Sequence, residues 1–203
     1  CIYSGQIGGP AMASYAKSNA TSAAAASDKH FQSAQKYWQE RFEGIRKMNG
    51  AENPYQLAKE LGEVMTEHCT VVRYNAGLTK ALEKVRELKE RWSRCNVLDT
   101  GNMANRSLSF TNQLWNMFEL GEVIAKSALL RDESRGAHYK PDFQLPEPKT
   151  RDPRQDAAWM EQWKARHEKW AKTTMARHDV SGPQISYDEI PTPVLDPEPR
   201  WYA

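Results

Sequence analysis

Apolar residues recur at intervals of three and four positions in three consecutive stretches of the chain. This spacing places them on one face of an α-helix. Asn53-Pro54, an N-cap followed by proline at the first helical position, starts the first predicted helix, which ends near Tyr74-Asn75. The second runs from about Ala76 to Trp92, and the third starts near Asn105. Short turns between such helices predict a mainly α fold, an antiparallel three-helix bundle. The predicted stripes are Leu57, Leu61, Val64, Met65, Cys69 and Val72; Leu78, Leu82, Val85, Leu88 and Trp92; and Leu108, Leu114, Phe118, Gly121, Ile124, Ala125 and Ala128.

The flanking segments divide the chain into three predicted parts. Residues 1–27 comprise a small-residue helix, expected to pack closely on another backbone, and a low-complexity linker. Residues 28–143 form the bundle domain and open with an aromatic-bearing helix from His30 to Met48. Residues 144–203 form a Pro-rich segment, a Trp-rich helix and an extended tail, with strand character at 184–190.

Two charged stretches have alternative interpretations. The run from Glu83 to Arg91 is expected to be a solvated face, with a surface pair between Glu87 and Arg91. Residues 156–177 are predicted to be helical, with basic residues interleaved between tryptophans. That pattern suggests either single-stranded nucleic acid or an amphipathic helix on a partner surface. The small net charge of +2 favours the second interpretation.

Composition excludes several function classes. The mean hydropathy of -0.79 and regular apolar spacing describe a helical protein with polar tails. No apolar run approaches the ~20 residues that span a bilayer. Cys1, Cys69 and Cys95 form neither a disulfide framework nor an iron–sulfur spacing, and the histidines lack metal-ligand spacing. The sequence contains no phosphate loop and no residues that define a reaction by themselves.

The stretch from Leu129 to Phe143 gathers charged residues around a glycine. Gly136 suits the left-handed position after a helix, so the third helix is predicted to stop there, and Pro141 prevents its return. Arg135 and His138 allow a catalytic interpretation, because arginine can clamp a carboxylate. The favoured interpretation is a helix end whose charges make structural hydrogen bonds.

Arg131-Asp132-Glu133-Ser134-Arg135-Gly136-Ala137-His138-Tyr139-Lys140-Pro141-Asp142-Phe143 resembles the signature in the C-terminal helical domain of succinate dehydrogenase and fumarate reductase flavoprotein subunits. The likeness extends over most of the chain and is greatest to the bacterial type that pairs with a cytochrome b anchor. One departure is a Trp-rich insertion after Phe143, through about Glu168. The other similar segments are Cys1 to Gly5, Asn53 to Gly62, Val71 to Asn75, Leu88 to Arg91, Val97 to Thr100, Phe110 to Leu114 and Ile185 to Ile190.

The resemblance implies that the full-length subunit interconverts succinate and fumarate by hydride transfer with FAD. It implies electron transfer to an iron–sulfur subunit and then to quinone, at the cytoplasmic face of the bacterial inner membrane. The chain starts at Cys1 without Met and is expected to be a fragment that starts inside the FAD domain. No catalytic, cofactor-binding or metal residue is assigned to it, and alone it is expected to bind no FAD and to be inactive. The signature residues Ser134, Arg135, Gly136 and His138 are expected to dock the bundle against the flavin domain. The alternative is a non-enzymatic helical scaffold or nucleic-acid-binding module.

Overall fold

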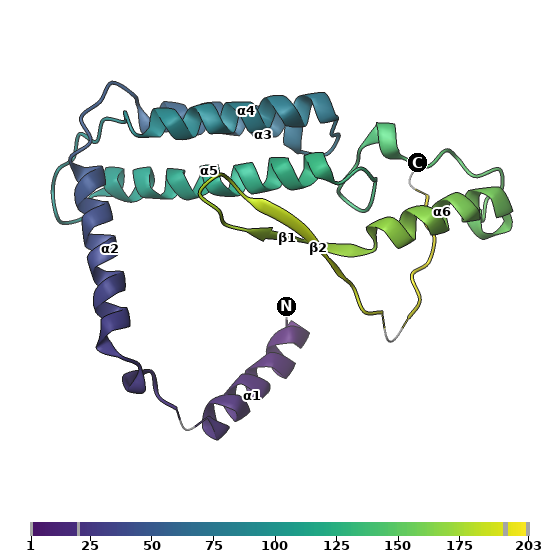
Figure 1. Ribbon diagram of the computed structural model, residues 1–203, viewed down its shortest axis with the longest axis horizontal. Coiled ribbons are helices and arrows are strands. Elements are labelled where there is room, and N and C mark those ends of the chain that lie inside the picture. Colours follow the sequence, from purple (N-terminus) through teal and green to yellow (C-terminus); the bar gives the residue numbers. More distant parts are fainter. Residues whose placement is uncertain (1, 20, 193–194, 202–203) are drawn as a thin grey trace. The chain divides into compact units, whose positions relative to one another are not determined.

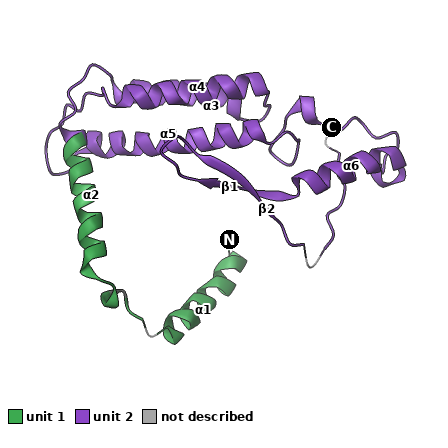
Figure 2. Cartoon of the chain, viewed as in Figure 1, with its two compact units in different colours: residues 1–44 green, residues 45–203 purple. Residues whose placement is uncertain are grey.

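The computed structural model describes residues 2–19, 21–192 and 195–201. The expectations for Cys1, and for the tail at 193–194 and 202–203, lie outside the described residues. The chain divides into two units, residues 1–44 and 45–203 (Figure 2). Each is described below by itself.

The first unit consists of helical segments whose described side chains are almost all exposed. Helix α1, Ile2–Ser18, and the short 3₁₀ turn η1, Ala23–Ala25, precede helix α2, Asp28–Arg46, which continues two residues into the second unit. The helical predictions are therefore confirmed for residues 2–17 and 30–46, and the second helix ends two residues before the predicted Met48. No residue of α1 is buried, so the surface on which it packs stays a prediction.

The second unit is built on three long helices: α3, Pro54–Cys69, α4, Asn75–Trp92, and α5, Arg106–Leu130 (Figure 1). The Asn53 side chain accepts a hydrogen bond from the Tyr55 N–H, and the Asn105 side chain accepts one from Leu108, so both predicted N-caps are confirmed. The three helices pack on one another, and consecutive helices run in opposite directions. The mainly α fold and the helical bundle predicted from the sequence are confirmed.

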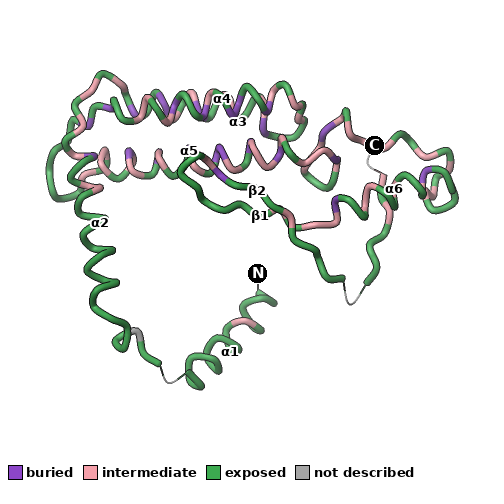
Figure 3. Tube along the Cα trace, viewed as in Figure 1, coloured by how far each residue is buried: buried purple, intermediate pink, exposed green. Residues whose placement is uncertain are grey.

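The buried residues lie where the three helices face each other (Figure 3). Leu57, Leu88 and Leu114 are fully buried in one cluster, and Leu78 and Ala125 in a second. Most of the predicted stripe positions are therefore correct. Ile124 and Val72 are exceptions, because they are 46% and 44% exposed.

A loop packs tightly against the end of α4. Residues 49–52 pair with residues 94–96 through backbone hydrogen bonds, among them Gly50 N–H to the Cys95 carbonyl. A β-carbon at Gly50 would lie 2.0 Å from the Arg94 carbonyl oxygen, so only glycine fits this approach. These bonds tie the segment before α3 to the end of α4.

The C-terminal part adds a helix and a hairpin. After the 3₁₀ turns η2, Pro141–Phe143, and η3, Pro153–Gln155, come helix α6, Ala157–Trp170, and strands β1, Lys172–Arg177, and β2, Gln184–Glu189. The strands pair antiparallel, with Lys172 opposite Glu189 and Arg177 opposite Gln184. The hairpin rests on α5, where Lys126 donates to the Pro183 carbonyl at 2.6 Å.

Three sequence expectations are wrong in detail. Residues 172–177 form a strand rather than the end of a helix, because they pair with 184–189 along their whole length. The first bundle helix ends at Cys69 rather than near Tyr74. The charge run from Glu83 to Arg91 is not a wholly solvated face, because several of its members pair with acids on neighbouring elements.

Arg91 shows the pairing most clearly. It bonds both carboxylate oxygens of Glu52, at 2.9 Å each, and reaches Glu60 at 2.7 Å. The expected pair between Glu87 and Arg91 is present at 3.1 Å. Arg91, followed by Lys84, lowers the pKa of Glu60 to about 2 despite the opposing effect of burial.

Candidate functional site

The segment that follows α5 begins earlier than the sequence suggests. The helix ends at Leu130, and Arg131 already has extended backbone angles, φ -98° and ψ 90°. The expectation that the helix stops at Gly136 is therefore wrong. The side chains of Lys140, Glu133 and His138 all bond Arg131, the first residue after the helix. The end of the helix therefore depends on residues that come later in the sequence.

Lys140 closes the open end of α5. Its side chain is fully buried, and its ammonium donates to the carbonyls of Ala128, Leu129 and Arg131 at 3.1–3.3 Å. It also donates to the Asp132 carboxylate at 2.7 Å. The last carbonyls of a helix lack intrahelical donors and carry partial negative charge, so a cation at this place satisfies both needs.

Glu133 is a second buried charge in the segment. Its carboxylate, 1% exposed, accepts from Arg131 on one oxygen and from Arg135 on the other. Arg131 also donates to the carbonyls of Trp170 and Lys172, at 2.5 and 3.0 Å. One arginine side chain thereby fixes the junction of α6 and β1 to the end of α5.

His138 lies between two groups of opposite polarity. Arg73 donates from its guanidinium to Nδ1 at 2.8 Å, so the imidazole is neutral there and its Nε2–H donates to the Arg131 carbonyl at 2.8 Å. Burial lowers the pKa of His138, the Arg131 carbonyl opposes this effect, and the Arg73 and Lys140 charges lower the pKa further. The neutral ring is therefore a structural link between Arg73 and Arg131 and not a general acid.

Gly136 belongs to a two-residue turn. Arg135 and His138 exchange backbone hydrogen bonds at 2.8 and 3.0 Å across Gly136-Ala137. Gly136 has φ +56°, which the first central position of such a tight turn requires and which residues with a β-carbon avoid. The predicted left-handed glycine is confirmed, in a hairpin turn rather than a helix cap.

The four residues expected to dock against the flavin domain, Ser134, Arg135, Gly136 and His138, have different surroundings in the structure. The Ser134 hydroxyl accepts from the Lys140 N–H and donates to the Lys140 carbonyl, so it is used within the segment, as is His138. Arg135 bonds Glu133 through Nε, and its side chain remains 43% exposed. These contacts agree with the favoured interpretation of a helix end with structural hydrogen bonds. The docking role of the four residues stays a prediction.

Sequence reasoning did not single out Arg73, Arg131, Glu133 or Lys140. The signal was present, because the basic residues Arg73, Arg131 and Lys140 stand within ten residues of a helix end, where unpaired carbonyls need donors. Their partners, however, come from segments up to 65 positions away, as with Arg73 and His138.

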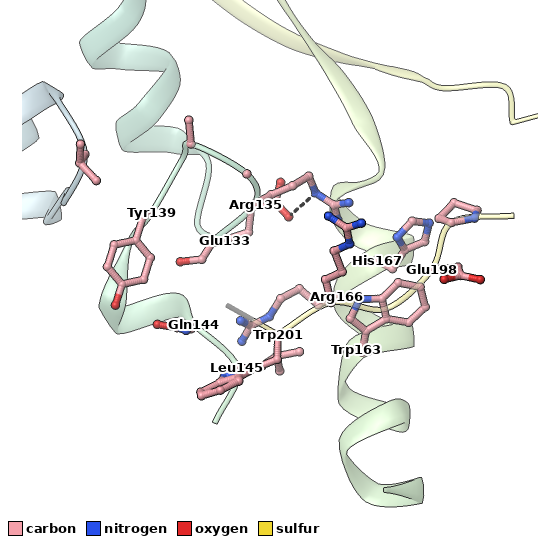
Figure 4. A pocket seen from close by; sticks show the side chains of 16 residues that line it. Glu133, Arg135, Tyr139, Gln144, Leu145, Trp163, Arg166, His167, Glu198 and Trp201 are labelled. Atoms are coloured by element: carbon pink, nitrogen blue, oxygen red, sulfur yellow. Dashed lines mark hydrogen bonds and ion pairs between the residues drawn. The ribbon is translucent and has the colours of Figure 1, made fainter. Parts of the chain in front are cut away.

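A cavity of about 320 Å³ opens beside the turn (Figure 4). Its walls come from residues 133–139, from α6 and from the segment at 197–201. Arg135, Arg166, His167, Trp163 and Trp201 gather around it in Figure 4. Within the described residues, no group of three or more His, Cys, Asp or Glu side chains suits a metal ion, and no helix is long and apolar enough to cross a membrane.

These features define a helical domain that ends in a buried charge cluster and a hairpin. The family described as "Fumarate reductase flavoprotein C-term" matches residues 58–202. The chain belongs to this family, and it is thus a C-terminal domain of the succinate dehydrogenase and fumarate reductase flavoprotein subunits.

Similar proteins support the assignment. The chain is 37% identical over 204 residues to the succinate dehydrogenase flavoprotein subunit of Bacillus subtilis (strain 168), covering 100% of this chain and 32% of that protein. It is 31% identical to the fumarate reductase flavoprotein subunit of Haemophilus influenzae, over 80% of this chain and 24% of that protein. A solved chain of Escherichia coli quinol fumarate reductase matches with a TM-score of 0.69 and 27% identity, over 86% of this chain and 27% of that one. The chain thus spans about a quarter to a third of the length of these relatives.

Proposed function

We propose that the complete subunit containing this domain interconverts succinate and fumarate by hydride transfer with FAD. Electrons then pass through the clusters of an iron–sulfur subunit to quinone, and a cytochrome b anchor retains the complex at the cytoplasmic face of the bacterial inner membrane. The observation that supports this proposal is similarity to a succinate dehydrogenase flavoprotein subunit along the whole chain.

The catalytic and flavin-binding groups of this proposal lie in the part of the subunit that this sequence does not contain. The domain itself contributes structure, and alone it binds no FAD and has no activity. Its buried charge cluster, centred on Glu133 and Lys140, makes a rigid end on which another domain can rest. Arg135 is the docking residue whose guanidinium extends from that end, since its side chain stays 43% exposed.

The complete subunit, purified with FAD, tests the proposal. It is expected to reduce an artificial acceptor with succinate and to reduce fumarate with a reduced dye. A flavin-loaded subunit with neither activity would contradict the proposal and would favour a non-enzymatic scaffold. Flavin bound to the 203-residue chain alone at equal molar amount would contradict the assignment of cofactor binding to the remainder of the subunit.

Replacing Arg135 tests the docking role. Lysine retains the charge but loses the planar fork of donors, so Arg135→Lys is expected to lower flavin retention in the complete subunit. The same change should leave the melting temperature of the isolated chain almost unaltered, because partly exposed ion pairs contribute little. Arg154→Lys is the matched control, since Arg154 also pairs with an acid two residues earlier and is exposed. An isolated chain that melts much earlier, beside a complete subunit with full flavin, would make Arg135 an internal cap only.

A further inference from the structure

Arg166 on α6 is a partly buried cation beside the cavity. In the described part of the chain its guanidinium donates to the Phe143 carbonyl, and it has no ion pair with a carboxylate. Burial lowers its pKa, and the charge of Glu133 acts in the opposite direction. Glu133 is already bonded by Arg131 and Arg135. A buried charge without a close counter-ion is unfavourable, so this position favours a bound anion.

Two further polar atoms in the cavity wall have no partner. His167 Nδ1 and Trp201 Nε1 are both buried and make no hydrogen bond with any described residue. The indole N–H can only donate, and a neutral imidazole can donate from Nδ1. Burial, and then the nearby Arg135 charge, lowers the pKa of His167, which favours that neutral form. The cavity therefore presents donors that require an acceptor.

The remaining wall is flat and apolar. Trp163 stacks on His167 with ring centroids 4.8 Å apart and planes 23° apart, and Leu145 and Trp201 also line the space. The volume of about 320 Å³ lies at the lower end of the ~300–1,000 Å³ typical of ligand sites. It has room for a single ring with one charged substituent.

We propose that this cavity binds a small organic anion, an aromatic carboxylate in which the ring lies against Trp163 and the carboxylate faces Arg166 and His167. Arg166 supplies the charge and His167 and Trp201 supply hydrogen bonds, so the ligand satisfies groups that the described chain leaves unpaired. The lining acids are Glu133, which Arg131 and Arg135 bond, and Glu198, which lies in the exposed C-terminal segment and whose charge acts on Arg154. The site uses no flavin, and its test does not depend on the reaction proposed above.

Indole N–H resonances of the ¹⁵N-labelled 203-residue chain provide the test. Trp163→Phe and Trp201→Phe variants assign the two signals of the cavity. Benzoate is the probe, acetate carries the charge without the ring, and benzyl alcohol carries the ring without the charge. Benzoate is expected to shift both signals saturably, and each of the other compounds should need at least about tenfold higher concentration.

Variants separate this site from general aromatic binding. Arg166→Gln is expected to weaken benzoate binding at least about tenfold and to leave benzyl alcohol unaffected, because only the charge-assisted contact is lost. Arg177→Gln, which removes an exposed arginine of β1, is the control and should bind benzoate like the parent chain. His167→Phe retains the ring stack and removes Nδ1, so it gives the same answer if Arg166→Gln fails to fold. Non-saturating benzoate shifts, equal binding of benzyl alcohol, or unchanged affinity in both Arg166→Gln and His167→Phe would overturn the proposal.

Discussion

Replacing Lys140 with methionine should destabilise the second unit more than any surface substitution. Methionine fills a similar volume but removes the ammonium that bonds three carbonyls of α5 and the Asp132 carboxylate. Removing one partner of a buried ion pair costs about 3–5 kcal/mol, because the other partner loses its counter-charge. Asp132 is 40% exposed and regains some hydration, which reduces the cost of losing its partner. The buried Ala128 carbonyl loses its donor without such compensation.

Urea unfolding followed by far-UV circular dichroism and tryptophan fluorescence measures this loss. Lys140→Met should lower the unfolding midpoint with an unchanged slope, since the folded structure and its buried area are the same. For a chain of this length, about 3–5 kcal/mol corresponds to roughly 6–20 °C in melting temperature. Lys80→Met, on the exposed face of α4, is the control and should change stability by no more than about 0.5 kcal/mol.

A loss below about 1 kcal/mol in Lys140→Met would refute the reasoning. It would show that the carbonyls at the end of α5 find water or other donors without the ammonium. Lys140→Arg provides a second check, because the larger guanidinium must be accommodated in a site with 0% exposure. It too should be less stable than the parent chain.

Two further predictions concern the bundle. Leu114→Ala should lower the free energy of unfolding by about 2–5 kcal/mol, because Leu114 is fully buried and its loss leaves a cavity; a midpoint equal to that of the parent chain would mean that α5 packs differently. Glu60, whose pKa falls from 4.5 to about 2 on folding through its bond with Arg91, should contribute stability that is fully present above pH 4.5 and disappears as the pH falls toward 2. Unfolding measured between pH 6 and about 2 should therefore show a shallower pH dependence in Glu60→Gln, and an identical dependence would argue against the Arg91 contact.

The sequence predicts the helices of the bundle well because their determinants are local. Asn53 and Asn105 are recognisable caps, and apolar spacing places Leu57 and Leu114 on buried faces. The caps and the stripe each need only neighbours within about two turns of helix. Local sequence patterns are therefore sufficient to predict the three helices of the bundle.

The rest depends on contacts between distant segments. Strand β1 follows a Trp-rich helix without a clear change in composition, and only pairing with β2 makes it a strand. The burial of Lys140 and Glu133 also could not be predicted, since isolated charges usually remain exposed. Their partners fix them inside, and sequence periodicity carries no information about such pairing.

The contacts of Arg131 have a consequence for how this domain tolerates changes in chain length. Arg131 bonds the Trp170 and Lys172 carbonyls, whereas Trp159 Nε1 bonds the Pro146 carbonyl and so holds the two ends of the 147–158 segment together. Residues added between these anchors would enlarge a surface loop at a small entropic cost, which grows only with the logarithm of loop length. A residue added between Trp170 and Thr174 would instead move β1 out of register with β2. Insertions and deletions should therefore accumulate before α6 and be rare after it, because one arginine side chain fixes the spacing there.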